Sequence, residues 1–228
     1  MLNDLIDFLF PKTSIISDER LDENNSNPYI KDEEILSLSK VTADDLEELR
    51  NKVTADLAFS IFAFREGDDF SKIIYQLKYG GMKRLGKFLG EIAGRELILQ
   101  FEKENLREFD LLIPVPLYKA KYRERGYNQS DLICNGINKY LEFEFIPDLV
   151  ERVKHTSTQT KLNREQRINN MKDAFDMNEK YKDYIYGKRI IVADDIVTTG
   201  STMNEVIKVL KDNCCGEVMG CSVAMARR

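Results

Sequence analysis

The feature that most constrains this chain is an apolar strand that runs directly into two acids and a hydroxyl-rich turn. Residues 190–193 are Ile, Ile, Val and Ala, and Asp194 and Asp195 follow without a break. Gly200 then lies within a series of Thr and Ser residues, and the apolar period of residues 201–212 predicts a helix. A continuous apolar strand that leads into a helix is typical of a parallel sheet covered on both faces.

The rest of the chain alternates between strands and helices in the same way. Strands are predicted at residues 57–64, 110–116, 187–194 and 216–225. Helices are predicted at residues 43–53, 68–79, 85–93, 128–140 and 201–212. This order predicts an α/β fold in which helices flank a parallel sheet.

Charge is distributed unevenly along the 228 residues. The chain has a net charge of -5, but residues 18–48 hold 11 acids and 3 bases, so the remainder is mildly basic. We therefore divide the chain into an N-terminal helical and acidic segment, residues 1–56, and a main domain, residues 57–228. The acidic segment is a candidate arm for a protein partner. The negative net charge argues against a generally basic nucleic-acid-binding protein, but it does not exclude nucleic acid as a partner.

Neither export nor a membrane span is expected. The first ten residues contain Asp4 and Asp7 but no Lys or Arg, unlike a signal peptide. No apolar run approaches the ~18 residues of a spanning helix. The protein is expected to be cytoplasmic, with its four cysteines reduced.

The segment after the apolar strand suits a phosphorylated sugar. A Gly-containing turn that opens a helix presents free backbone N–H groups, and the helix dipole adds partial positive charge. The two carboxylates can accept hydrogen bonds from vicinal hydroxyls such as those of a ribose. The structural alternative, a capped helix after a strand, accounts for one acid and one hydroxyl. It does not account for two acids and five consecutive small or hydroxylated residues.

Residues 190–202 resemble the signature with which type I phosphoribosyltransferases bind 5-phosphoribosyl 1-pyrophosphate (PRPP). The resemblance is closest to one branch, the ComF family, which is associated with competence for DNA uptake. Two further stretches carry it, namely PVPL with RERGYNQ at 114–129 and LKYGG at 77–81. A third set of matching residues is Arg152, Thr158, Gln159, Leu162, Arg167, Asn170 and Phe175.

The resemblance implies a role for each matching residue. Asp194 and Asp195 would bind the ribose hydroxyls and offset the positive charge of the transition state. The 5-phosphate would be held by Val197, Thr198, Thr199, Gly200, Ser201 and Thr202. Pyrophosphate would be held by Leu117, Tyr118, Arg123, Arg125, Arg164 and Arg167. Mg²⁺ would be carried by the pyrophosphate near the two aspartates, and residues 152–172 would form a hood that closes over PRPP.

For the other cations of these stretches, an ordinary solvated surface is the favoured interpretation. These are Lys119, Lys121, Lys161 and Lys172. Residues 81–88 nearly match a nucleotide-binding loop, but Phe88 replaces the hydroxyl that would bind Mg²⁺, so a helix is favoured.

The chain departs from the family pattern in two places. ComF-like proteins usually begin with cysteine-rich zinc ribbons, whereas no Cys precedes Cys134, so a zinc-dependent nucleic-acid contact is not supported. Thr198 stands where hypoxanthine-type enzymes have an Asp, which argues against a 6-oxopurine acceptor. An acceptor pocket is expected around residues 64–79.

Two functions follow from these observations. The first is a Mg²⁺-dependent enzyme that transfers the phosphoribosyl group of PRPP to an unknown nitrogen nucleophile and releases pyrophosphate. The second is a non-catalytic protein that senses PRPP or a nucleotide, or that assists DNA uptake through partners.

Overall fold

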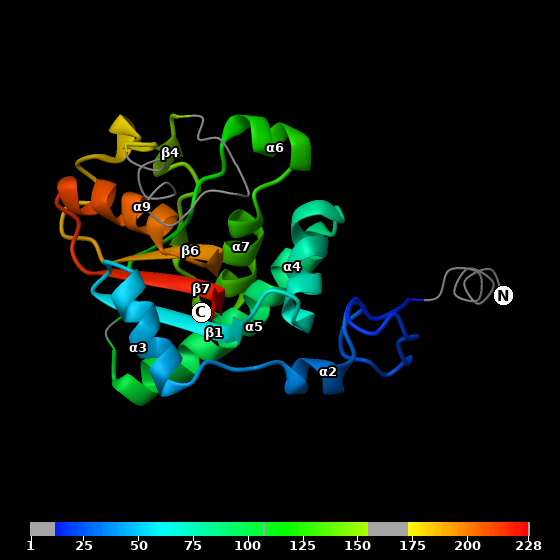
Figure 1. Cartoon of the computed structure of the whole chain (residues 1–228). Helices are drawn as coiled ribbons and strands as arrows, with labels where there is room; N and C mark the ends of the chain where they lie inside the picture. Colours follow the sequence, from blue (N-terminus) through cyan, green and yellow to red (C-terminus); the bar gives the residue numbers. More distant parts are fainter. Residues whose placement is uncertain (1–11, 107, 155–172, 228) are drawn as a thin grey trace.

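The computed structural model describes residues 12–106, 108–154 and 173–227 (Figure 1). Its centre is a five-stranded sheet in the order β1-β7-β6-β2-β3, in which all neighbours are parallel. The strands are β1 (Leu57–Phe64), β2 (Leu111–Pro114), β3 (Glu144–Phe145), β6 (Ile190–Val197) and β7 (Val218–Ala226). The predicted α/β class and parallel sheet are therefore confirmed.

Helices cover both faces of this sheet. They are α2 (Asp32–Ser37), α3 (Ala43–Lys52), α4 (Asp69–Tyr79), α5 (Lys83–Glu104), α6 (Lys119–Arg125), α7 (Gln129–Leu141) and α9 (Ser201–Asp212). A two-stranded antiparallel sheet, β4 (Val150–Arg152) with β5 (Phe175–Met177), and a 3-10 turn at Glu179–Tyr181 complete the described elements.

The apolar strand β6 is buried because it lies between two cores. Ile191 and Ala193 pack in the core that contains α4, α5 and α7, whereas Ile190 and Val192 pack in the core with α9 and α3. Successive side chains of a strand point to opposite faces, so a strand covered on both sides needs an unbroken apolar run. This explains the pattern from which the fold was predicted.

Helices α5 and α7 approach each other at glycines. A Cβ atom at Gly90 would lie 2.1 Å from the carbonyl oxygen of Ile133, and one at Gly136 would lie 2.2 Å from that of Lys87. Gly86, which belongs to the near-match to a nucleotide-binding loop, faces the Leu132 side chain in the same interface. This stretch lies in a continuous helix from Lys83 onward, as favoured from the sequence.

The first described residues form a small lobe beside α4, seen in blue in Figure 1. The lobe is tied to the body by Ile16 and Ile30, which are buried in the shared core, and by Lys72 Nζ, which donates to Ile16 O at 2.7 Å. Residues 12–31, which precede α2, consist of turns, bends and a bridge between Thr13 and Arg20.

Helix α3 is part of the main body. The Lys52 ammonium is buried and donates to Ala226 O at 2.7 Å, and the Arg227 guanidinium pairs with the Asp45 carboxylate at 2.7 Å. These contacts join the acidic segment to the end of β7. The division after residue 56 stays a prediction, but it falls within a shared core.

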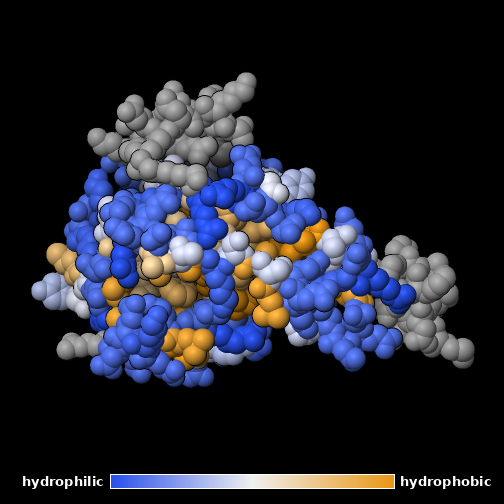
Figure 2. Space-filling model, turned by 60° about the horizontal axis from the view of Figure 1, so that its bottom comes forward, coloured by the Kyte–Doolittle hydropathy of each residue, from blue (hydrophilic) through white to orange (hydrophobic). Residues whose placement is uncertain are grey.

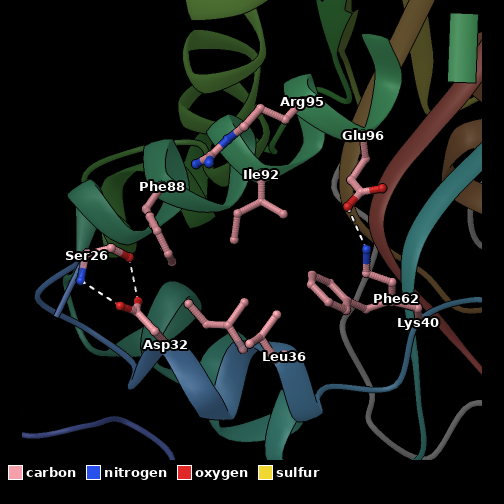
Figure 3. A pocket seen from close by; sticks show the side chains of 10 residues that line it. Ser26, Asp32, Leu36, Lys40, Phe62, Phe88, Ile92, Arg95 and Glu96 are labelled. Carbon is pink, nitrogen blue, oxygen red and sulfur yellow. Dashed lines mark hydrogen bonds and ion pairs between the residues drawn. The ribbon is translucent and has the colours of Figure 1, made fainter. Parts of the chain in front are cut away.

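A groove of about 390 Å³ lies between α2 and α5 (Figure 3). Leu36, Phe62, Phe88 and Ile92 contribute apolar side chains to it (Figure 3). Figure 2 shows apolar areas, in orange, on an otherwise largely hydrophilic face of the molecule. None of its lining residues belongs to the site predicted from the sequence. Among the helices of the described residues, none is long and apolar enough to cross a membrane.

Candidate functional site

Both predicted catalytic aspartates lie inside β6, near its carboxyl end. The sequence predicted that this strand ends at residue 194, but the structure extends it to Val197, and Asp194 still pairs with Ser222 of β7. Asp195 is 6% exposed and Asp194 is half-buried. The sheet itself therefore positions the two carboxylates, and a ligand at its carboxyl edge meets them first.

Each carboxylate is held by specific donors. Asp194 Oδ1 accepts from Ser130 Oγ at 3.0 Å and from the backbone N–H of Asp195 at 2.9 Å. Asp195 Oδ1 accepts from the N–H of Ile196 at 2.8 Å, and Asp195 Oδ2 lies 2.9 Å from Lys78 Nζ. The pair is thus fixed by α7 on one side and by the last turn of α4 on the other.

Burial and the neighbouring charges act in opposite directions on the Asp194 carboxyl group. Withdrawal from water, and then the neighbouring Asp195, raise the pKa of Asp194 to about 7, although Lys78 opposes this rise. Burial lowers the pKa of Lys78, but the attraction and hydrogen bond to Asp195, together with attraction to Asp194, outweigh burial and leave that pKa raised. Lys78 thus stays charged at its contact with Asp195.

The predicted 5-phosphate loop follows directly and opens α9. Gly200 adopts φ +80°, and a Cβ there would lie 2.2 Å from Lys52 O, so the turn needs glycine. Thr199 Oγ1 and Ser201 Oγ lie 2.6 Å apart across the turn. Gly200 offers no side chain to cap α9, which leaves first-turn N–H groups for an anion. Along the loop, Val197 is buried, Thr202 is half-buried and Thr198 is exposed.

The Asn204 side chain connects this loop to the N-terminal segment through hydrogen bonds. Its Nδ2 donates to Lys52 O at 2.8 Å, and its Oδ1 accepts from the N–H of Thr54 at 2.9 Å. The first turn of α9 therefore packs on the end of α3. No local sequence pattern pointed to this contact.

The predicted pyrophosphate residues are only partly brought together. Leu117 and Tyr118 are half-buried just before the short helix α6, which the sequence analysis did not predict. Arg125 is half-buried and stacks over the Tyr79 ring at 5.3 Å, whereas Arg123 is exposed. The other two predicted arginines, Arg164 and Arg167, and most of the hood lie outside the described residues.

Lys121 is not the ordinary solvated lysine that the sequence suggested. It is half-buried, and burial followed by repulsion from Arg125, Arg152 and Lys78 lowers its pKa. This repulsion indicates that the four cations share one neighbourhood. Because Lys78 touches Asp195, this neighbourhood borders the aspartates and suits a polyanion.

Sequence reasoning gave no individual role to three residues at the site. Lys78, Ser130 and Arg152 stand within or beside the stretches that carry the family resemblance. They come close to Asp194 and Asp195 only when the chain folds. In the sequence, only the motifs LKYGG and RERGYNQ, which carry the family resemblance, pointed to these parts of the chain.

A protein-only metal centre is not evident in the described part of the chain, where no three acidic, thiol or imidazole side chains converge. Asp194 and Asp195 nonetheless supply hard oxygen ligands. Mg²⁺ commonly binds through one or two carboxylates together with substrate phosphates. The residues present therefore fit Mg²⁺ that arrives with a phosphorylated ligand.

Comparison with known proteins agrees with this geometry. The phosphoribosyl transferase domain family matches residues 147–228. Competence protein F of Haemophilus influenzae is 40% identical over 102 residues, which cover 45% of this chain and 44% of that protein. DNA utilization protein YhgH of Shigella flexneri is 32% identical over 143 residues, which cover 63% of this chain and 61% of that protein.

These matches span about half of the length of the curated relatives. Among solved structures, adenine phosphoribosyltransferase from Thermoanaerobacter pseudethanolicus aligns with a TM-score of 0.38 at 14% identity, over 79% of this chain and 99% of that one. From the family match, the relatives and the parallel sheet together, the chain carries a phosphoribosyl transferase-type domain at residues 147–228 and is similar to competence and DNA utilization proteins of the ComF type.

Proposed function

We propose that this protein binds PRPP with Mg²⁺ and transfers its phosphoribosyl group to a nitrogen nucleophile, with release of pyrophosphate. One observation carries the proposal. A buried aspartate pair in β6 continues directly into a glycine turn at the start of α9, and a cluster of cations borders the pair. Acceptors for hydroxyl groups, N–H groups suited to a phosphate and cations suited to a polyanion thereby lie next to one another.

The chemistry assigns a task to each group. The bond between ribose C1 and the pyrophosphate oxygen breaks, pyrophosphate leaves with the electron pair, and the acceptor nitrogen forms the new bond and loses a proton. Asp194 and Asp195 accept hydrogen bonds from the ribose hydroxyls, and their charge stabilises a cationic transition state. Arg125 and Lys121 face the leaving group. Bound Mg²⁺ would neutralise charge on the pyrophosphate.

Calorimetric titration of the full chain with PRPP tests this function. We expect binding that strengthens when Mg²⁺ is present, followed by pyrophosphate release when nitrogen nucleophiles are screened. Absence of binding at millimolar PRPP would overturn the proposal.

Lys78→Met is expected to shift the pH dependence of PRPP binding. In the native protein, binding should strengthen as the pH rises through about 7, where Asp194 loses its proton. Removal of Lys78 takes away a charge that lowers the pKa of Asp194. The pH midpoint of PRPP binding should therefore move to a higher pH. Titrations between pH 5.5 and 9 measure this shift.

Lys72→Met is the matched control, because Lys72 lies on the same helix but pairs with Asp69. The pH midpoint of PRPP binding by the Lys72→Met protein should equal that of the native protein. A Lys78→Met midpoint that is unchanged or lower would contradict the assigned role of Lys78.

The second candidate function is a non-catalytic, competence-associated role with the same ligand site. It is favoured by the names of the relatives, which refer to competence and DNA utilization rather than to an enzyme. The acidic N-terminal segment would then bind a protein partner. PRPP binding without pyrophosphate release, across a broad screen of acceptors, would select this alternative.

A further inference from the structure

A single turn connects the separate parts of the candidate site. Residues 127–130 join α6 to the first turn of α7, and all four of them are buried. Their side chains contact three parts of the chain that are distant in sequence: the end of α4, the backbone after β2 and the aspartates of β6. We call residues 127–130 the anchoring turn.

Two side chains of the anchoring turn support the part of the site proposed for the ribose. The Tyr127 hydroxyl donates to Leu77 O at 2.6 Å, which fixes the last turn of α4, where Lys78 lies. Ser130 Oγ donates to Asp194 Oδ1 at 3.0 Å. Through these two contacts, the anchoring turn determines the positions of the Lys78 ammonium and the Asp194 carboxylate.

Asn128 of the same turn contacts the backbone on the other side of the site. It is the N-cap of α7, and its Oδ1 accepts from the N–H of Ser130 at 3.3 Å. Its Nδ2 donates to Asp131 Oδ1 at 2.7 Å and to Val115 O at 3.1 Å. An N-cap needs only an acceptor, which Ser or Asp supplies equally well. The amide donor of Asn128 therefore has a task besides capping.

Val115 is the residue at which the backbone leaves the end of β2. Its N–H donates to Ala193 O in β6 at 2.8 Å, and its carbonyl accepts from Asn128. Val115 is thus held through both of its backbone polar groups. Because the chain continues directly from it, this anchorage sets the direction of residues 117–118, which are expected to contact pyrophosphate, and of α6 behind them.

We propose that Asn128 is a positioning residue for the leaving group: through Val115 O it holds residues 116–125 where they contact the pyrophosphate of PRPP. This inference rests on the proposed function, because pyrophosphate is the ligand that these residues bind there. The anchoring turn then sets the spacing between the aspartates proposed for the ribose and the cations proposed for pyrophosphate. This spacing matters because a misplacement of about 1 Å at a reacting centre can cost about 100-fold in rate.

Asn128→Ser tests this role, because serine keeps an oxygen for the helix cap but is too short to reach Val115 O. Calorimetry on the full chain with Mg²⁺ compares PRPP, pyrophosphate and ribose 5-phosphate as ligands. The variant should bind PRPP and pyrophosphate about tenfold more weakly, the effect of one lost hydrogen bond to a charged group. It should bind ribose 5-phosphate as the native protein does.

Two further variants separate positioning from a general loss of stability. Asn138→Ser removes a similar amide at the far end of α7, which donates to Phe143 O at 2.7 Å, and it should change none of the three affinities. Ser130→Ala should weaken the binding of PRPP and ribose 5-phosphate together, because Ser130 supports Asp194, and should leave pyrophosphate binding unchanged. Circular dichroism confirms that each variant is folded.

Hydrogen exchange followed by mass spectrometry reports on the same residues without any ligand. In Asn128→Ser, the backbone N–H groups of residues 117–125 should exchange faster than in the native protein, whereas those of residues 198–205 should not change. An equal loss of affinity for all three ligands, or native-like exchange at residues 117–125, would contradict the role of Asn128. If the native protein bound none of the ligands, the proposed function would fail and the leaving-group role with it. Faster exchange in the variant would then still show that Asn128 holds this part of the backbone.

Discussion

An Asp195→Asn protein is expected to bind PRPP with Mg²⁺ about 100-fold more weakly than the native protein and to show no measurable turnover. The change removes the charge that faces the ribose in the proposed complex, and it leaves the half-buried Lys78 ammonium without its partner at 2.9 Å. Hydrogen bonds to charged groups contribute about 1.5–3 kcal/mol each, and transition-state stabilisation adds to this loss. Calorimetry measures the binding, and pyrophosphate release measures the turnover.

Two variants make this result interpretable. Asp212→Asn removes an exposed acid from the far end of α9 and should leave PRPP binding unchanged. A Lys78→Met and Asp195→Asn double variant removes both members of the ion pair, so it should regain thermal stability lost in the single variant without regaining PRPP binding. Native-like binding by folded Asp195→Asn protein would contradict the role given to Asp195.

Gly90→Ala is expected to lower the free energy of unfolding by about 3 kcal/mol or more, although helix propensity alone predicts a gain of about 1 kcal/mol. The new Cβ would lie 2.1 Å from Ile133 O, 2.8 Å from Ile133 C and 2.9 Å from Gly136 Cα. All three are backbone atoms, so α5 and α7 would have to separate. Urea unfolding followed by circular dichroism measures the change.

Two substitutions on the same helix calibrate this prediction. Gly94→Ala should lower the free energy of unfolding by less than Gly90→Ala, because the nearest contact of the new Cβ would be 2.9 Å, to Ile137 O. Leu99→Ala, at a side chain that is 59% exposed, should change stability by about 0.5 kcal/mol or less. A Gly90→Ala protein that is more stable than the native protein would show that the two helices are not held in this close contact.

Much of the fold could be predicted because its central strands are long and strongly apolar. The structure confirms the strand at Leu57–Phe64 and the helix at Ser201–Asp212 with the predicted bounds. The short elements were missed for physical reasons. Helix α6 consists mostly of charged residues without an apolar stripe, and β4 and β5 have three residues each.

The site was predicted only as far as it is continuous in sequence. The aspartates and the proposed phosphate loop occupy one strand–turn–helix unit, so local sequence patterns are enough to predict them as candidates. Lys78 and Ser130 reach the same aspartates from other helices, and no periodicity encodes such contacts. Lys121 was assigned to solvent because an isolated lysine usually lies there, whereas its neighbours are set by the packing of α6 near α4.

The contact between Gly200 and Lys52 limits how this domain can be exchanged with others. Composition suggests that the acidic segment is an accessory which recombination could replace at residue 57. Yet the end of α3 supports the glycine turn, and Asn204 bonds to the chain on both sides of residue 53. A chimera joined at residue 57 would keep every strand of the sheet and lose the support of its phosphate loop. The smallest exchangeable unit therefore includes α3 from Ala43 onward.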